Sequence, residues 1–132
     1  MPDHAALPFS VVAFVRDHLE TLEQLELLTL LIKAPERWWD AAAAAETLGI
    51  SAKNTSDALE RLASRNLLAI SITTDVRYQF QPGTTTLRDA SEAFAEACRT
   101  NPIAVFRLVT DRQRRAMREF SDAFRLRRHD DR

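Results

Sequence analysis

The sequence predicts a mainly helical fold with one small β-hairpin, and three observations favour this class. The residues that favour helix, Ala, Leu, Glu and Arg, dominate the composition. Only 2 glycines occur in the chain, which is too few for the many tight turns of a sandwich or barrel. Apolar residues recur at helical spacing over most of the chain, and they alternate only between residues 67 and 80.

The chain has the size and composition of one folded domain covering residues 1–132. Hydrophobic residues make up 45% and charged residues 28%, close to the average of globular proteins that fold on their own. A chain of this length can bury a sizeable core without metals or disulfides. Cys98 is the one cysteine, no apolar run is long enough to span a bilayer, and the N-terminus does not resemble a signal peptide. We therefore expect a cytoplasmic protein with no membrane contact.

Two helices are predicted at the start of the chain. Residues 9–20 place four apolar side chains on one helical face: Val11, Val12, Val15 and Leu19. Thr21 can cap the next helix while the side chain of Gln24 reaches back, which forms a capping box. The run LEQLELLTLLIK that follows is apolar nearly all round in its later turns, so we expect it in the middle of the domain.

A short helix and a longer helix, joined by a tight turn, are predicted next. Asp40 is an N-cap candidate for AAAAAETL, Gly49 fits the left-handed position after that helix, and Ser51 can cap the following one. Asn66 can adopt the left-handed conformation that closes the longer helix at about 52–66. That helix turns four residues inward: Thr55, Leu59, Leu62 and Ala63. The pair forms a helix-turn-helix.

The hydrophobic period then changes from helix to strand and back. LLAISIT and VRYQF alternate around a turn at Thr74 and Asp75, which predicts a hairpin. Residues 84–127 return to helical spacing, and Pro102 divides them because proline disfavours helix at the residue before it. We expect a short apolar helix over IAVFRLV, followed by a last helix whose capping box is Thr110 with Gln113.

Residues 21–80 resemble the winged helix-turn-helix domain of bacterial transcription regulators of the MarR and ArsR type. ETLGIS at 46–51 matches the helix, glycine turn and N-cap of that domain, and ALERLASRNLLAI at 58–70 matches the end of its recognition helix and its first wing strand. The C-terminal run FSDAFRLRR is similar to the tail of a group of small bacterial winged-helix proteins. The resemblance implies a winged helix-turn-helix with a C-terminal helical extension, and duplex DNA as the ligand.

On this resemblance, the helix at about 52–66 enters the major groove of DNA. Lys53 and Arg61 can hold phosphates, and Asn54 can pair with adenine. Asp57 and Glu60 lie among them and repel the DNA backbone, so a solvated face of mixed charge stays open as the alternative. The candidate DNA contacts, which include the only base of the wing, are Ser51, Lys53, Asn54, Ser56, Arg61 and Arg77.

The net charge of −1 is unevenly distributed along the chain. Residues 1–106 hold 9 basic and 14 acidic residues, whereas residues 107–132 hold 9 arginines and 5 acids. The first part therefore lacks the basic footprint that is typical of nucleic-acid-binding proteins. The arginine-rich tail is a phosphate-binding arm, a site for an acidic partner, or a solvated helix face that offsets the acidic body.

Residues 84–127 hold more apolar side chains than a winged-helix core requires. Each large one contributes about 1.5–3 kcal/mol when it leaves water, so exposing several is unfavourable. These side chains can fold back on their own core or pack against the same helices of a second copy. We expect a two-fold homodimer. Its predicted contacts are Phe94, Val105, Phe106, Val109, Met117, Phe120 and Phe124.

The sequence holds no recognisable catalytic or metal-binding pattern. His4, His18 and His129 are far apart, and none has a second ligand at metal-binding spacing. Cys98, on the same stripe as Phe94, fits a small buried hydrophobe better than a nucleophile. A glycine-rich phosphate loop and a nucleophile elbow both need more glycine than the chain offers. We therefore expect no enzyme activity, no metal and no cofactor.

The leading interpretation is a DNA-binding transcriptional regulator that acts as a homodimer. The alternative is a winged-helix protein-interaction module that binds a protein partner and no DNA. It is supported by the acidic body and the thin basic footprint. DNA binding that depends on salt concentration distinguishes the two.

Overall fold

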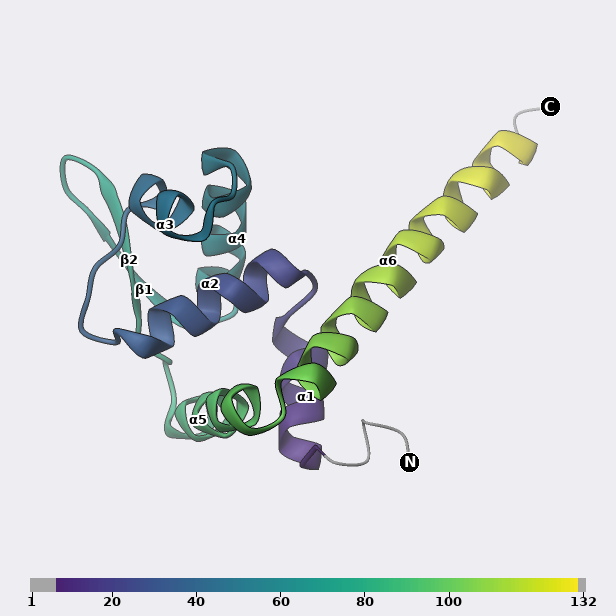
Figure 1. Cartoon of the computed structure of the whole chain (residues 1–132). Coiled ribbons are helices and arrows are strands. Elements are labelled where there is room, and N and C mark those ends of the chain that lie inside the picture. Colours follow the sequence, from purple (N-terminus) through teal and green to yellow (C-terminus); the bar gives the residue numbers. More distant parts are fainter. Residues whose placement is uncertain (1–6, 131–132) are drawn as a thin grey trace.

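The computed structural model describes residues 7–130, and it describes the side chains of residues 7–123. Along these residues it holds six helices and two antiparallel strands: α1 (Phe9–His18), α2 (Leu22–Lys33), α3 (Ala41–Leu48), α4 (Ala52–Ser64), β1 (Leu68–Ile72), β2 (Val76–Phe80), α5 (Thr85–Thr100) and α6 (Pro102–Asp130). The predicted fold class is confirmed, because this order is that of a winged helix-turn-helix extended by C-terminal helices. Figure 1 shows a body of helices and hairpin from which α6 projects.

The core lies where α1, α2, α4 and α5 meet the first turns of α6. Phe94 of α5 is fully buried and packs on Phe14 of α1, with ring centroids 5.0 Å apart. Burial of each large side chain contributes about 1.5–3 kcal/mol, so this cluster dominates the stability of the body. α2 lies in the middle, as its apolar sequence predicts, with three fully buried leucines: Leu27, Leu28 and Leu31.

Polar caps begin and end the helices where the sequence predicts them. The Oγ1 atom of Thr21 accepts a hydrogen bond from the N–H of Gln24 at 3.2 Å. The Oε1 atom of Gln24 accepts from the N–H of Glu20 at 2.7 Å, so the return bond of this capping box falls one residue earlier than expected. Asn66 follows α4 at a φ of 67°, as predicted for the residue that closes this helix.

The hairpin is extended by one residue pair that the sequence did not reveal. β1 and β2 pair with Leu68 opposite Phe80. On the other edge of β2, Trp39 forms an isolated bridge with Tyr78, and the two backbone N–H···O bonds are both 2.8 Å long. The ring of Trp39 is buried under the guanidinium of Arg37, whose central carbon lies 3.5 Å from the ring centroid. The bridge therefore fastens the base of the wing to the segment before α3.

The predicted start of a separate last helix at Thr110 is wrong. Pro102 begins α6, as predicted, but the helix then continues without a break to Asp130, because no glycine or proline follows. The hydroxyl of Thr110 donates to the carbonyl of Arg107 in the same helix at 3.1 Å. Gln113 caps α2 instead, since its Oε1 atom accepts from the N–H of Leu22 at 3.3 Å.

The second half of α6 leaves the body, and we call residues 114–130 the arm. Every described side chain of the arm, in residues 114–123, is exposed. Figure 1 shows the arm as the yellow-green helix that runs away from all other elements. At 1.5 Å per residue the arm is about 25 Å long. Helices in water are held mainly by packing an apolar face, and the described part of this chain does not cover the arm.

Candidate nucleic-acid interface

The turn between α3 and α4 directs the N-terminus of α4 towards solvent. Asp40 caps α3, because its Oδ1 atom accepts from the N–H of Ala43 at 2.7 Å. Gly49 ends α3 at a φ of 71°, where any residue with a side chain is strained. Ser51 then begins α4, and its Oγ atom accepts from the N–H of Asn54 at 3.1 Å. All three predicted roles are confirmed, so the sequence itself sets this turn.

α4 has one buried face and one exposed face. Thr55, Leu59 and Leu62 are fully buried, as predicted, and Ala63 is half-buried. The hydroxyl of Thr55 donates to the carbonyl of Ser51 at 2.8 Å, so this buried polar group is satisfied. The buried face holds α4 against α2 and α3 and leaves the opposite face free to bind.

The predicted DNA contacts of α4 lie on its exposed face. Ser51, Lys53, Asn54 and Arg61 are exposed, and Ser56 is half-buried. Asn54 and Arg61 are seven residues apart, so they share one side of the helix two turns from each other. The structure thus gathers five of the six candidates at α4 or its N-cap.

Two carboxylates interrupt this face. Asp57 and Glu60 are exposed and line an open hollow together with Arg61. A second hollow, between α4 and the first turn of α2, is lined by Glu23, Asp57 and Arg61 among others. A phosphate that approaches Arg61 therefore meets carboxylates as well, which weakens its attraction.

The wing adds little positive charge. Arg77 of β2, the sixth candidate, is exposed, but its Nε atom donates to the carboxylate of Asp75 at 3.1 Å. The exposed large side chains of the hairpin are apolar instead: Ile70, Ile72 and Val76, exposed by 50%, 76% and 43%. Ile72 lies opposite Val76, so they form one apolar wing tip. The sequence analysis did not predict this apolar tip. The alternation of the strand could have indicated it, because Ile72 lies on the same face of β1 as the buried Leu68.

Three of the seven predicted dimer contacts belong to the core of this chain. Phe94, Val105 and Val109 are at most 1% exposed, so they offer no surface to a second copy, which corrects the prediction for these residues. They are covered because α5 and the first turns of α6 pack against α1 and α2. The spacing of apolar residues in a sequence does not show whether a stripe is buried by its own chain or by a partner.

The other predicted dimer contacts are exposed wherever the structure describes them. Phe106 is 50%, Met117 is 67% and Phe120 is 75% exposed, and Ile103 adds a further 64%. The side chain of Phe124 lies outside the described residues. We call Ile103, Phe106, Met117 and Phe120 the apolar stripe of α6, because their spacing places them on one side of the helix. They form two exposed apolar pairs, Ile103 with Phe106 and Met117 with Phe120, and exposed apolar groups of this kind mark candidate interaction surfaces.

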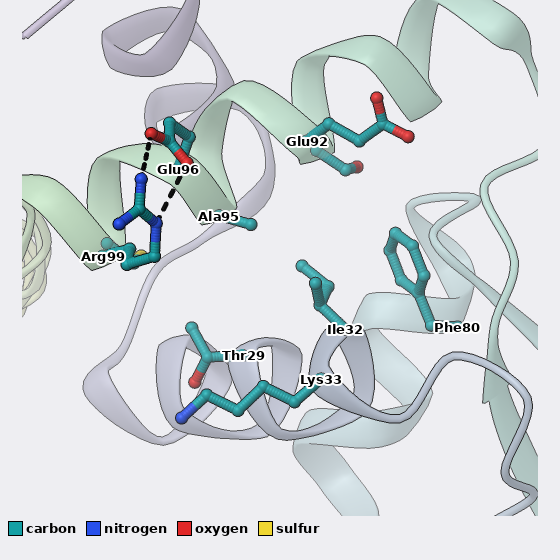
Figure 2. A pocket seen from close by; sticks show the side chains of 10 residues that line it. Thr29, Ile32, Lys33, Phe80, Glu92, Ala95, Glu96 and Arg99 are labelled. Carbon is teal, nitrogen blue, oxygen red and sulfur yellow. Dashed lines mark hydrogen bonds and ion pairs between the residues drawn. The ribbon is translucent and has the colours of Figure 1, made fainter.

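A cavity of about 570 Å³ lies between α2 and α5, away from the exposed face of α4. Figure 2 shows Ile32 and Phe80 facing Ala95 across it. Arg99 and Glu96 stand at its rim and neutralise each other through two hydrogen bonds of 2.5 and 3.2 Å. Its volume and apolar lining suit a small, mostly apolar molecule.

Cys98 also lines this cavity, and it is half-buried. Burial raises the pKa of its thiol to about 11, and the positive charge of Lys33 opposes this effect only weakly. The thiol is therefore protonated at neutral pH and is a poor nucleophile. Within the described residues, no three His, Cys, Asp or Glu side chains gather closely enough to hold a metal ion. None of the helices in that same part of the chain has the length and hydropathy needed to cross a membrane.

The element order and the turn before α4 define the class as a winged helix-turn-helix with a projecting C-terminal helix. Among solved structures, the chain is similar to heme-free PefR, with 23% identity and a TM-score of 0.49 over 70% of this chain and 86% of that one. No family model matches the chain, and no curated protein matches it. At this identity the likeness concerns the fold alone, and the class follows from the elements and turn described above.

Proposed function

We propose that this chain is a DNA-binding transcriptional regulator that reads duplex DNA with α4. One observation carries the proposal. The first turns of α4 stand exposed, with Lys53 and Asn54 on the side that faces solvent. In helix-turn-helix proteins that bind DNA, the residues in these turns contact base edges in the major groove. A fold does not dictate an activity, so the side chains on this face supply the argument.

Each candidate side chain has a distinct role in this proposal. Lys53 and Arg61 contact phosphates, which fixes the position of α4 on the duplex without reading its sequence. Asn54 reads the sequence, because its amide can donate to and accept from the edge of an adenine. Ser51 and Ser56 donate hydroxyl hydrogen bonds to phosphates or bases. Arg77 reaches the DNA backbone from the wing when its pair with Asp75 opens.

The proposed binding is weak for a single copy. Three cations among the described side chains face the duplex in this proposal, and Asp57 and Glu60 oppose them. Each phosphate contact contributes about −0.9 to the slope of log affinity against log salt, so one copy gives a slope of about −3. A second copy that binds a second half-site doubles the number of contacts.

We propose that the second copy pairs through the arm and the apolar stripe of α6. Met117 and Phe120 are exposed apolar side chains of the arm. In a two-fold dimer, the same side chains of a second arm can bury them. A notch of about 470 Å³ lies where the arm leaves the junction of α1 and α2, lined by these two residues with Glu20 and Thr21. The notch offers a place for an apolar side chain of the partner.

The experiment is a fluorescence anisotropy titration with labelled genomic duplexes that include the promoter of the gene itself. Lys53→Ala and Arg61→Ala are each expected to weaken binding and to reduce the salt slope by about 1, because each loses one phosphate contact. Asn54→Ala is expected to relax base preference more than it lowers affinity. Arg88→Ala is the matched control, since this exposed base lies on α5. If the α4 variants bind as the control does, this helix does not read DNA.

A second candidate function is a protein-interaction module without DNA binding. The apolar wing tip and the carboxylates of Asp57 and Glu60 favour it, because DNA-binding faces are basic. This candidate predicts no salt-sensitive DNA binding at about 50 mM salt, where electrostatic contacts are strongest. It also predicts that Ile72→Ser releases a protein partner, whereas Lys53→Ala retains it. Sequence-dependent DNA binding at moderate salt rules it out.

A further inference from the structure

α4 and α6 are distant in the sequence, but residues at their ends or along them make polar contacts with the same short turn. This turn joins α1 to α2, and we call residues 17–22 the junction. α1 ends at His18 and α2 begins at Leu22, so carbonyl and N–H groups at these helix ends lack partners within the helices. Leu19 in the middle of the junction is fully buried and anchors it to the core. The free backbone groups are taken up by side chains from elsewhere.

The first tie comes from Arg65, the residue that caps the C-terminus of α4. One guanidinium nitrogen donates to the carbonyl of Asp17, and another pairs with the carboxylate of Glu20 at 2.5 Å. The side chains of Arg65 and Glu20 are only 28% and 34% exposed, so water screens this pair less than a surface pair. Charge-assisted hydrogen bonds of this kind are stronger than neutral ones, so the end of α4 is held firmly on the junction.

The second tie comes from α6, immediately before the arm (Figure 1). The Nε atom of Arg112 donates to the carbonyl of Leu19 at 2.8 Å. The side chain of Gln113 accepts from the N–H of Leu22 at 3.3 Å. From residue 114 onward every described side chain is exposed, so the contacts of Arg112 and Gln113 lie where α6 leaves the body. They set the direction in which the arm leaves.

We propose that the junction couples α4 to the arm, with Arg65 and Arg112 as the positioning residues. α4 packs on α2, α3 and β1, while α6 packs on α1, α2 and α5, so α2 and the junction are the parts that the two helices share. A shift of the arm, such as pairing with a second copy imposes, moves the backbone that Arg65 holds. The consequence for DNA affinity rests on the proposed function, but the coupling itself does not.

Hydrogen–deuterium exchange of the full chain, followed by mass spectrometry, tests the coupling without DNA. Arg112→Gln is expected to speed exchange in α4, which it does not touch, and Arg65→Gln to speed exchange in residues 102–113. Couplings of this kind correspond to about 2- to 30-fold, so we expect at least about threefold. Arg99→Gln is the matched control, because Arg99 lies on α5 outside the junction and pairs with Glu96 one turn earlier in the same helix. Changes confined to the helix that carries each substitution overturn the proposal.

Two further measurements keep the result interpretable. β2 is the internal reference, because its main neighbours are β1 and α2 rather than α4 or α6. If exchange in β2 also rises, the Gln variants are globally destabilised. The same measurement is then made on Arg65→Lys and Arg112→Lys, which keep the charge and one donor, and a rise in the distant helix of these variants supports the coupling while its absence overturns it. A DNA titration is read separately. Distal exchange changes without DNA binding support the coupling and refute the proposed function, whereas DNA binding without distal changes refutes the coupling alone.

Discussion

Phe120 offers a direct test of self-association through the arm. Its side chain is 75% exposed in a single copy. Complete burial of such a side chain contributes about 1.5–3 kcal/mol, so covering the exposed part contributes roughly 1–2 kcal/mol per copy. A two-fold interface counts it twice, which gives roughly 2–4 kcal/mol. Phe120→Ala is therefore expected to raise the dimer dissociation constant roughly 30- to 900-fold.

Sedimentation velocity over a range of concentrations measures this change. Phe120→Met is the control, because it keeps an apolar side chain of similar reach and should retain most of the dimer. The melting temperature of the monomeric variant should stay near that of the wild-type chain at low concentration, since Phe120 contributes little to the body. A wild-type chain that is monomeric at tens of micromolar, or a variant with an unchanged dissociation constant, refutes the reasoning.

Three further predictions concern single residues of the body. Ser51→Ala removes the cap of α4 and should lower the free energy of unfolding by about 1 kcal/mol in a urea titration; an unchanged value would show that the cap carries no stability. Phe94→Ala should lower it by about 3–5 kcal/mol at any protein concentration, because the side chain fills the core; a loss that appears only on dilution would instead indicate a dimer contact. Cys98 should react with iodoacetamide at pH 7 about 100-fold more slowly in the folded chain than in urea, because burial raises its pKa from 9.0 to about 11. Since the folded pKa is the raised one, stability should be full below pH 9 and decline towards pH 11 relative to Cys98→Ala, and parallel profiles of the two chains would contradict the shift.

The local features of the fold could be predicted because each depends on a few neighbouring residues. Asp40, Gly49 and Ser51 carry the signals of a cap, a left-handed turn and a second cap within twelve positions. Asn66 was expected at a positive φ, and the structure places it there. The exposed face of α4 follows from helical periodicity for the same reason.

The features that sequence reasoning missed depend on contacts between distant segments. Thr110 and Gln113 have the spacing of a capping box, but only the position of α2 reveals that Gln113 caps Leu22. Nothing in the sequence around Phe94 shows whether this side chain packs in the core of its own chain or against a partner. The contacts that Arg65, Arg112 and Gln113 make with the junction likewise require the folded backbone, because each joins residues that are 45 to 93 positions apart in the sequence.

The central claim, that α4 binds DNA, is tested most directly by titrating the wild-type chain against labelled promoter duplex at about 50 and about 200 mM salt. Three phosphate contacts per copy predict that affinity falls roughly 40-fold between these conditions for one copy, and roughly 1,000-fold or more for a dimer on two half-sites. The account also predicts that a duplex of scrambled sequence binds more weakly. Absence of binding at about 50 mM salt, or binding that does not change with salt, would contradict it.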